Sequence, residues 1–462
     1  MKLKTFTRLV ALAGLLLAGQ GTMAQERNTM TIFNRAKFYD GYLLDKNPDS
    51  LVQDGILRHR TSLYAVKMTD EQLSQIGDSL EMDVSVRSCC DNYDRIGNIN
   101  LAFVPKGQER YVPDSVQRIE IGRFITPFMD KNKMPREVPY HYSVPYLSYI
   151  LNDSQLRSQY DIWVEFELFG VPYAAQQQIR GCANRSDVFL GSLFFSTLQP
   201  AQPQTDKDVL VPIVIKNPEY IGRNLDNYDS LGTDTIGKTT KTYHYTVPRD
   251  VADAQLVIVT SNHGANSGGE EYNRRWHYVY VDDRLALVYK PGRSSCEPFR
   301  QYNTQPNGIY QTSAMTDEQW QSFSNWCPGD VIDNRIVALG PVKAGEHKVR
   351  ISVPDAVFNE KQGDIPVSIF FQGLTEGTLN SIRQVKASVK AEMTVKQTGS
   401  MLVFGGKPGV MSAELRDMQG KLILQTENQP TMNVAACQPG VYLVSLELTD
   451  GILETHKIVI KK

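Results

Sequence analysis

The sequence has few of the residues, and none of the motifs, on which metal-dependent or serine-based hydrolysis usually depends. The 462-residue chain has seven histidines and six cysteines. The histidines form no His-x-His pair of the kind that binds copper, and neither His-Glu-x-x-His nor Gly-x-Ser-x-Gly occurs. No two cysteines have the Cys-x-x-Cys spacing of a structural zinc site. We therefore expect a protein without a metal ion or another cofactor.

The chain also lacks an excess of either charge and any long apolar run after its first residues. Its 49 basic and 51 acidic side chains give a formal charge of -2, which offers no electrostatic case for nucleic acid or an anionic membrane. Residues 1–24 have a basic start, a short apolar run and a small-residue end, the pattern of a secretory signal peptide. We expect the mature chain to be soluble outside the cytoplasm, without stable insertion in a membrane, and to be a monomer.

The six cysteines fit an oxidising compartment, because all of them lie after the signal peptide. Cys296 and Cys327 are 31 positions apart, and a disulfide between them would contribute about 3 to 4 kcal/mol by restricting the unfolded chain. Cys89 and Cys90 are neighbours and need a partner elsewhere, for which Cys182 is the natural candidate. Cys437 is left over.

Short strand-like segments dominate the rest of the chain. Apolar and β-branched runs between turn residues occur, among other places, at residues 256–260, 276–281, 349–353 and 365–371. Short strands at regular spacing are typical of antiparallel sandwiches. Polar segments at residues 197–208 and 375–397 interrupt the pattern and indicate three domains. The helical patterns at residues 70–80 and 317–325 look like loop insertions.

The first candidate catalytic residues follow a predicted strand. Apolar and polar residues alternate from Leu80 to Arg87, and residues 89–95 (CCDNYDR) come soon after. A turn at a strand end is a common place for reactive side chains. Asp91 and Asp94 beside Arg95 are therefore candidates, although a turn with a surface ion pair would have the same composition.

Two further groups of polar residues lie on a strand and in a loop. In residues 161–168, alternation places Trp163, Glu165 and Glu167 on one face. This face is either a carbohydrate platform or an ordinary exposed sheet face. Residues 261–275 contain His263, Glu271 and three glycines, but not the G-x-G-x-x-G order of a phosphate loop. A polar hairpin loop is the simpler interpretation there.

Three motifs resemble the peptide:N-glycosidase F family, secreted bacterial enzymes that remove N-linked glycans from asparagine. They are CDNYDR at residues 90–95, EIGRFITPF at residues 120–128 and NWCPG at residues 325–329. The resemblance implies an all-β fold with two antiparallel jelly-roll domains side by side, residues 28–197 and 206–375, and a site at their interface. It also implies an amidase whose substrates are N-glycoproteins or glycopeptides.

By this resemblance, the catalytic residues are Asp94, Glu271 and Glu165. Asp94 is expected to activate or orient water, Glu271 to hold the same water from the second domain, and Glu165 to position the first sugar. Clustered carboxylates raise at least one pKa, so one of them can stay protonated and donate. The expected substrate contacts are Arg95, Tyr93, Trp163, Glu167, His263 and Trp326.

The tail after a linker at residues 376–400 reads as a separate module of two hairpins, with turns at residues 419–420 and 450–451. Its motifs LRDMQGKLI, PGVYLVSLELTDG and HKIVIKK resemble the sorting domain of type IX secretion substrates. This resemblance covers residues 401–462 and implies a small β-sandwich. It also implies recognition by the type IX machinery and passage through the periplasm and outer membrane, followed by release or surface attachment.

Two rival interpretations come from the same resemblance. Paired jelly rolls also occur in copper-dependent monooxygenases, but the scattered histidines disfavour copper. A non-catalytic carbohydrate-binding surface protein is the second rival. It is favoured by Glu167, which stands where the family has a tryptophan, and by the absence of family cysteines beside Glu271.

Overall fold

The structure is a computed structural model, and the predicted signal peptide lies outside its described residues. It describes residues 27–43, 52–77, 79–198, 201, 203–216, 240–264, 270–293, 295–305, 316–321, 324–356, 365–379, 393–406, 409–417, 422–448 and 453–461.

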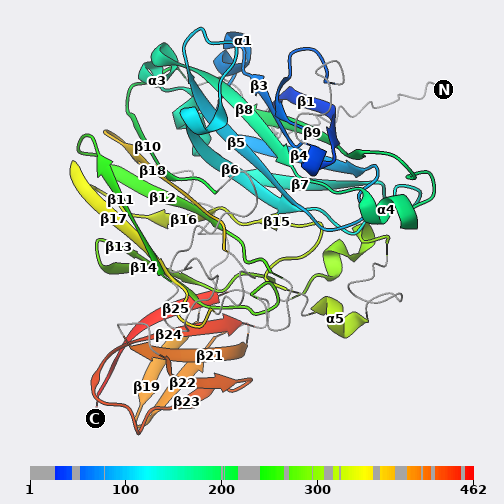
Figure 1. Ribbon diagram of the computed structural model, residues 1–462. Coiled ribbons are helices and arrows are strands. Elements are labelled where there is room, and N and C mark those ends of the chain that lie inside the picture. Colours follow the sequence, from blue (N-terminus) through cyan, green and yellow to red (C-terminus); the bar gives the residue numbers. More distant parts are fainter. Residues whose placement is uncertain are drawn as a thin grey trace, which may run out of the picture.

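The first sandwich consists of two antiparallel sheets, drawn mainly in blue and cyan in Figure 1. One sheet has the order β1 (Arg27–Tyr39), β9 (Asp187–Leu198), β4 (Glu81–Ser88) and β7 (Glu137–Ser143). The other has the order β15 (Val331–Ile332), β6 (Gln117–Ile125), β5 (Ile96–Pro105), β8 (Tyr160–Leu168), β3 (Leu63–Lys67) and β2 (Leu57–Arg60). The predicted alternation in β4 is confirmed, because every second side chain of this strand is buried. The buried side chains join a core that includes Phe33, Phe38 and Phe166.

The second sandwich has the same kind of architecture. Its sheets have the orders β10 (Asp208–Val214), β18 (Val367–Leu374), β12 (Asp253–Thr260), β16 (Arg335–Ala338), and β11 (Thr240–Val247), β17 (Gly345–Ser352), β13 (His277–Val281), β14 (Arg284–Tyr289). Leu256, Ile258 and Phe371 belong to its core. The strands predicted from residues 256–260, 276–281, 349–353 and 365–371 are therefore confirmed. The strand β15 comes from this half of the sequence but pairs with β6 of the first sandwich.

A bulge in β6 turns two charged side chains toward the second sandwich. Ile99 pairs with Gly122 but Asn100 pairs with Glu120, so β6 has one extra residue at this point. The bulge reverses the alternation and places Glu120 and Arg123 on the same face. Their side chains are fully buried and form a bidentate ion pair, with Arg123 Nε 2.8 Å from one Glu120 oxygen. Arg123 Nη1 also donates to Ser261 Oγ at 2.8 Å, which joins the two sandwiches.

The helices are short. Within the described residues, the α-helices are α1 (Asp70–Ser74), α2 (Leu147–Leu151), α3 (Ser154–Gln159), α4 (Tyr173–Gln178) and α5 (Asp317–Gln321), and 3₁₀ turns lie at Gly41–Leu43, Pro113–Ser115 and Glu297–Tyr302. The two predicted helices are thus confirmed in position but are shorter than expected. α1 begins with a capping box in which Thr69 and Gln72 satisfy each other's backbone amides. No helix among these residues is long and apolar enough to span a bilayer.

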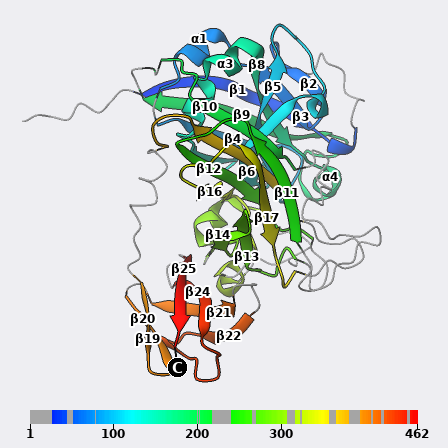
Figure 2. The same cartoon turned by 90° about the vertical axis from the view of Figure 1, so that its left-hand side faces the viewer.

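The C-terminal module lies beyond the second sandwich, as Figures 1 and 2 both show. Its sheets have the orders β19 (Thr394–Thr398), β20 (Met401–Gly405), β23 (Thr431–Asn433), and β22 (Leu422–Glu427), β21 (Val410–Asp417), β24 (Gly440–Leu448), β25 (Leu453–Ile460). The pairs β21–β22 and β24–β25 confirm both predicted hairpins, whose turns fall outside the described residues. Arg416 of β21 contacts the second sandwich through an ion pair with Asp355 at 3.1 Å. The predicted all-β class is confirmed.

Candidate active site

The turn at residues 91–95 is organised by Asp91, which is buried. Its carboxylate accepts hydrogen bonds from Arg95 Nε at 2.7 Å, from the backbone N–H of Tyr93 at 3.0 Å and from that of Val171 at 2.7 Å. The ion pair expected in this turn is therefore present, but it involves Asp91 and it is largely buried. Asp94 has no role in this bracing and is partly exposed.

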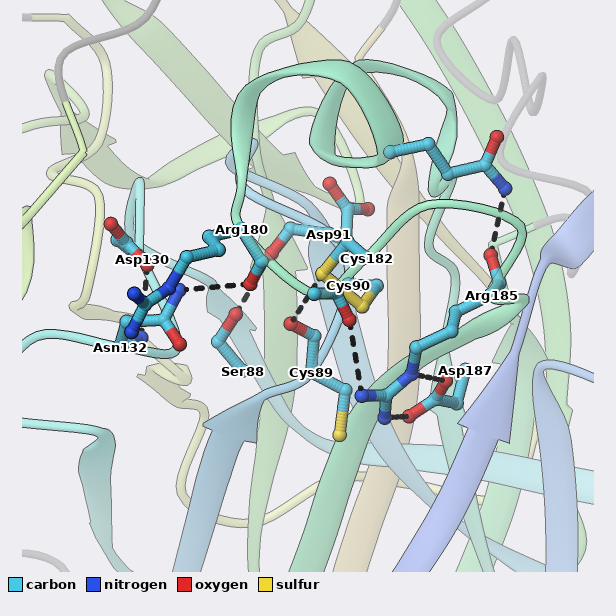
Figure 3. The surroundings of a disulfide bond; sticks show 12 residues. Ser88, Cys89, Cys90, Asp91, Asp130, Asn132, Arg180, Cys182, Arg185 and Asp187 are labelled. Atoms are coloured by element: carbon cyan, nitrogen blue, oxygen red, sulfur yellow. Dashed lines mark hydrogen bonds and ion pairs between the residues drawn. A yellow bond between two sulfur atoms is a disulfide. The ribbon is translucent and has the colours of Figure 1, made fainter.

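Two further connections fix the turn. A disulfide joins Cys90 to Cys182, while Ser88 Oγ donates to the carbonyl oxygen of Asp91 at 2.9 Å (Figure 3). The second motif also packs against the turn, because Arg95 N donates to Thr126 Oγ1 at 2.7 Å and Thr126 N donates to the Arg95 carbonyl at 2.8 Å. The turn that carries Asp94 is thus rigid on both sides.

Glu271 lies in the loop that follows β12 of the second sandwich. Its side chain accepts a hydrogen bond from Gly264 N at 3.2 Å, and its backbone N–H donates to the Gly264 carbonyl oxygen at 3.3 Å. Residues 265–269, between them, lie outside the described residues. Asn325 Nδ2 donates to the carbonyl oxygens of Glu270 at 2.6 Å and Glu271 at 2.7 Å. The first residue of the NWCPG motif therefore supports Glu271.

Asp94 and Glu271 interact although they come from different sandwiches. Burial and the nearby Glu271 carboxylate raise the pKa of Asp94 to about 8, and the Arg95 guanidinium opposes part of this rise. Burial also raises the pKa of Glu271. Both side chains remain partly exposed. Two of the three predicted catalytic residues, both partly exposed, therefore lie within electrostatic reach of each other.

Glu165 does not share this position, because it is fully buried beneath the polar face of its sheet. Arg118 Nη2 lies 2.5 Å from one carboxylate oxygen, Asn100 Nδ2 donates to the same oxygen at 3.0 Å, and the Tyr111 hydroxyl donates to the other at 3.0 Å. These partners are all protein groups, and Glu165 has no solvent-exposed surface. The prediction that Glu165 holds a sugar needs correction: its carboxylate belongs to a buried ion-pair network.

The face predicted as a carbohydrate platform is also buried. Glu167 pairs with Arg60 at 2.5 Å and with Lys216 of the second sandwich at 3.1 Å. These charges and a hydrogen bond from Lys216 hold the pKa of Glu167 below its usual value despite its burial. Trp163 is 4% exposed and packs against Tyr111, with 5.5 Å between ring centroids. Trp163, Glu165 and Glu167 share a face, as predicted, but Tyr111, and Lys216 of the second sandwich, help to cover it.

Four predicted substrate contacts are sequence neighbours of the carboxyl pair or of the residues that hold it. Tyr93 and Arg95 are partly exposed, with the guanidinium 5.3 Å from the ring centroid. His263 is also partly exposed and is neutral, since burial and the charges of Arg123 and Lys216 lower its pKa to about 3. The prediction that Trp326 contacts the substrate needs correction, because Trp326 is 4% exposed and its indole N–H donates to the Asn262 carbonyl oxygen at 3.0 Å.

Sequence reasoning missed the residues that hold these groups in place. Asn325 belongs to a motif that carries the family resemblance, but the motif does not show which backbone Asn325 holds, and the turn sequence does not distinguish the bracing role of Asp91 from the role of Asp94. Arg118 and Glu120 alternate on β6, which signals a polar face, but the bulge that adds Arg123 to this face has no obvious signal. The partners of a buried charge are set by strand pairing, which the sequence pattern does not reveal.

The cysteine predictions are resolved by two disulfides. Cys296–Cys327 is present as predicted, and Cys90, not Cys89, pairs with Cys182. Cys89 and Cys437 are free thiols, both buried. Over the described part of the chain, no three His, Cys, Asp or Glu side chains lie close enough together to hold a metal ion.

Comparison with protein-family models gives three matches. Residues 29–183 match the N-terminal part of peptide-N-glycosidase F, and residues 232–372 match its C-terminal part. Residues 400–461 match a secretion system C-terminal sorting domain. No curated protein matches the sequence.

Among solved structures, PNGF-II is similar with 18% sequence identity and a TM-score of 0.54, over 76% of this chain and 65% of PNGF-II. PNGase F, a glycosylasparaginase from Flavobacterium meningosepticum, matches with 16% identity and a TM-score of 0.47, over 76% of this chain and 97% of that one. This chain thus spans just under two thirds of PNGF-II. The likeness to PNGF-II supports the fold. The type IX sorting domain marks the chain for export across the outer membrane. With both halves of the family model matched in order, the chain belongs to the peptide-N-glycosidase F family.

Proposed function

We propose that this protein is a secreted amidase that cleaves the bond between an N-linked glycan and its asparagine. The observation that carries the proposal is the Asp94–Glu271 pair. Two partly exposed carboxyl groups from different sandwiches interact, and the pKa of each is raised. Such pairs are typical of sites that need an acid and a base at the same pH.

The pair can supply both proton transfers that amide hydrolysis needs. Two neighbouring carboxyl groups avoid carrying two charges, so they keep one proton between them around neutral pH. The ionised group takes a proton from water as the water oxygen bonds to the asparagine side-chain carbon. The protonated group gives its proton to the nitrogen as the carbon–nitrogen bond breaks. The products are a glycosylamine and a peptide whose asparagine has become aspartate.

The roles within the pair follow from their neighbours. Burial and the Glu271 carboxylate raise the pKa of Asp94 to about 8, although the Arg95 guanidinium opposes part of this rise, so Asp94 holds the shared proton around neutral pH. We assign Glu271 to the removal of a proton from the attacking water, and Asp94 to the orientation of the same water and to the protonation of the leaving nitrogen. Tyr93, Arg95 and His263 are the partly exposed groups available to contact the substrate. Glu165 and Glu167 have structural roles, because Glu165 pairs with Arg118 within the first sandwich and Glu167 pairs with Lys216 of the second.

A deglycosylation assay tests the proposal. Purified mature protein is incubated with a denatured N-glycoprotein, and mass spectrometry records released glycan and a gain of about one dalton at asparagine, the amide-to-acid change of the proposed step. Asp94→Asn and Glu271→Gln should each abolish most of the release, whereas Asp114→Asn, a change at an exposed carboxylate of the same sandwich, should not. Glycan that is bound but never released by the parent protein would instead indicate the non-catalytic carbohydrate-binding protein.

A further inference from the structure

Two exposed tyrosines lie side by side on the first sandwich. Tyr42 is 53% exposed and Tyr173 is 50% exposed, which makes them the most exposed aromatic side chains among the described residues. Their rings are nearly parallel, with an angle of 12° and 6.4 Å between centroids. The edge of Phe169 packs against Tyr42, with centroids 5.2 Å apart. We call the pair Tyr42 and Tyr173 the tyrosine shelf.

The shelf is held by a buried carboxylate and by close backbone packing. Asp40 is 2% exposed; its Oδ1 accepts a hydrogen bond from Tyr42 N at 3.1 Å, and its side chain accepts one from the Tyr173 hydroxyl. Gly41 N donates to the Gly170 carbonyl at 2.9 Å. A Cβ added to Gly41 would lie 2.3 Å from Phe169, so the two loops touch. The exposed rings are therefore fixed in place.

The same loops connect the shelf to the turn that carries Asp94. Val171, two residues before Tyr173, donates its backbone N–H to Asp91 at 2.7 Å, and Asp91 also binds Arg95. The Arg95 guanidinium lies within electrostatic reach of both Asp94 and the Tyr42 phenol. A ligand that binds at Asp94 and contacts Arg95 would therefore have the shelf within its reach.

We propose that the tyrosine shelf is a subsite for sugar rings of the glycan beyond the two nearest to asparagine. The apolar face of a pyranose ring packs on an aromatic ring, and its hydroxyl groups need polar partners at the rim. Here the phenol hydroxyls and Arg95 provide these partners. Exposed rings that are already ordered also bind at a lower entropic cost. This inference rests on the proposed function only for the identity of the ligand.

The test separates binding at the shelf from catalysis. Asp94→Asn protein is titrated with a free N-glycan oligosaccharide and with free chitobiose. The further changes Tyr42→Ala and Tyr173→Ala should weaken binding of the long oligosaccharide about tenfold and leave chitobiose less affected. Tyr42→Phe, which keeps the ring but loses the hydroxyl, should bind more tightly than Tyr42→Ala and less tightly than the Asp94→Asn protein with both tyrosines. Val112→Ala, a change at another exposed apolar side chain of this sandwich, serves as the control.

Three outcomes decide the matter. Unchanged oligosaccharide binding in the double alanine variant would overturn the proposal. In a second series, the alanine changes are made in the active enzyme. If oligosaccharide binding is unchanged but the KM of these variants rises with the length of the peptide part of the substrate, the shelf contacts the peptide, and this result would also overturn the proposal. If the parent protein released no glycan but its oligosaccharide binding depended on the two rings, the subsite would stand and the proposed hydrolysis would fail.

Discussion

Asn325 Nδ2 lies 2.7 Å from the backbone carbonyl oxygen of Glu271 and donates a hydrogen bond to it. The same nitrogen also contacts the carbonyl oxygens of Glu270 and Asn273. Ser324 Oγ donates to the Glu271 carbonyl at 2.6 Å, next to Asn325. A motif residue from one loop thus fixes the backbone of another, and with it the position of a proposed catalytic carboxylate.

Replacement of Asn325 by alanine should lower glycan release by about 10- to 100-fold, because a small displacement of Glu271 misplaces a proposed catalytic carboxylate. Glu271 itself is retained, so the loss should appear in kcat more than in KM. A shift in the pH profile would accompany it if Glu271 has moved away from Asp94. Asn132→Ala, a change at an exposed asparagine of the first sandwich, is the control. Equal activity of Asn325→Ala and the parent would contradict the positioning role.

The pH profile should report the carboxyl pair. Because the pKa of Asp94 is raised to about 8, glycan release should fall as the pH rises through that value and the pair becomes doubly ionised. Glu271→Gln removes the neighbouring charge, so the pKa of Asp94 should decrease and the residual activity should decline at a lower pH. An identical high-pH limb in parent and Glu271→Gln protein would show that the two groups do not interact.

Asp94 should also make the fold less stable at alkaline pH. Its pKa is raised from 3.8 to about 8 in the folded protein, so the folded state holds the proton more tightly than the unfolded chain. This contribution is fully present below about pH 4 and is lost as the pH rises through about 8. Asp94→Asn should therefore gain up to about 4 kcal/mol relative to the parent between pH 5 and pH 9, and less where solvent screens the partly exposed side chain. Denaturant titrations at both pH values measure the gain, and a constant difference would contradict the assignment.

The Glu167–Lys216 ion pair should be important for joining the two sandwiches. Both side chains are about 5% exposed or less, and removing one partner of a buried pair costs about 3 kcal/mol. Lys216→Met should lower stability by roughly this amount, and the additional change Glu167→Gln should restore part of it. Lys343→Met, which breaks an exposed pair with Asp250, should cost less than about 1 kcal/mol. Equal effects at the two lysines would show that Lys216 is not buried in solution.

The Cys296–Cys327 disulfide should stabilise the second sandwich and its active-site loops. It closes a loop of 31 residues, which corresponds to about 3.5 kcal/mol in the chain-entropy model. Cys327 directly follows Asn325 and Trp326, so replacing both cysteines by alanine should lower the melting temperature and glycan release together. A melting temperature equal to that of the parent would contradict the prediction. Cys89→Ala, a change at a buried free thiol, tests whether any loss comes simply from a missing sulfur atom.

The sequence alone determined the all-β class, because alternation in β4 and the short apolar runs of β12 and β18 follow directly from side-chain burial on pleated strands. It also indicated the Cys296–Cys327 disulfide, the tail hairpins and, through family motifs, Asp94 and Glu271. These are local patterns, or residues next to a recognisable turn.

Only the tertiary structure decided which polar face is buried and which charges meet. Glu165 and Glu167 alternate like residues of an exposed face, yet Arg118 and Lys216 from distant segments cover and neutralise them. The choice of Cys90 over Cys89, the bulge that turns Arg123 inward and the proximity of Tyr42 to Arg95 likewise depend on strand register and on the contact between sandwiches. Alternation with a period of two shows which side chains share one face of a strand. It does not show what covers that face, because residues far away in the sequence supply those contacts.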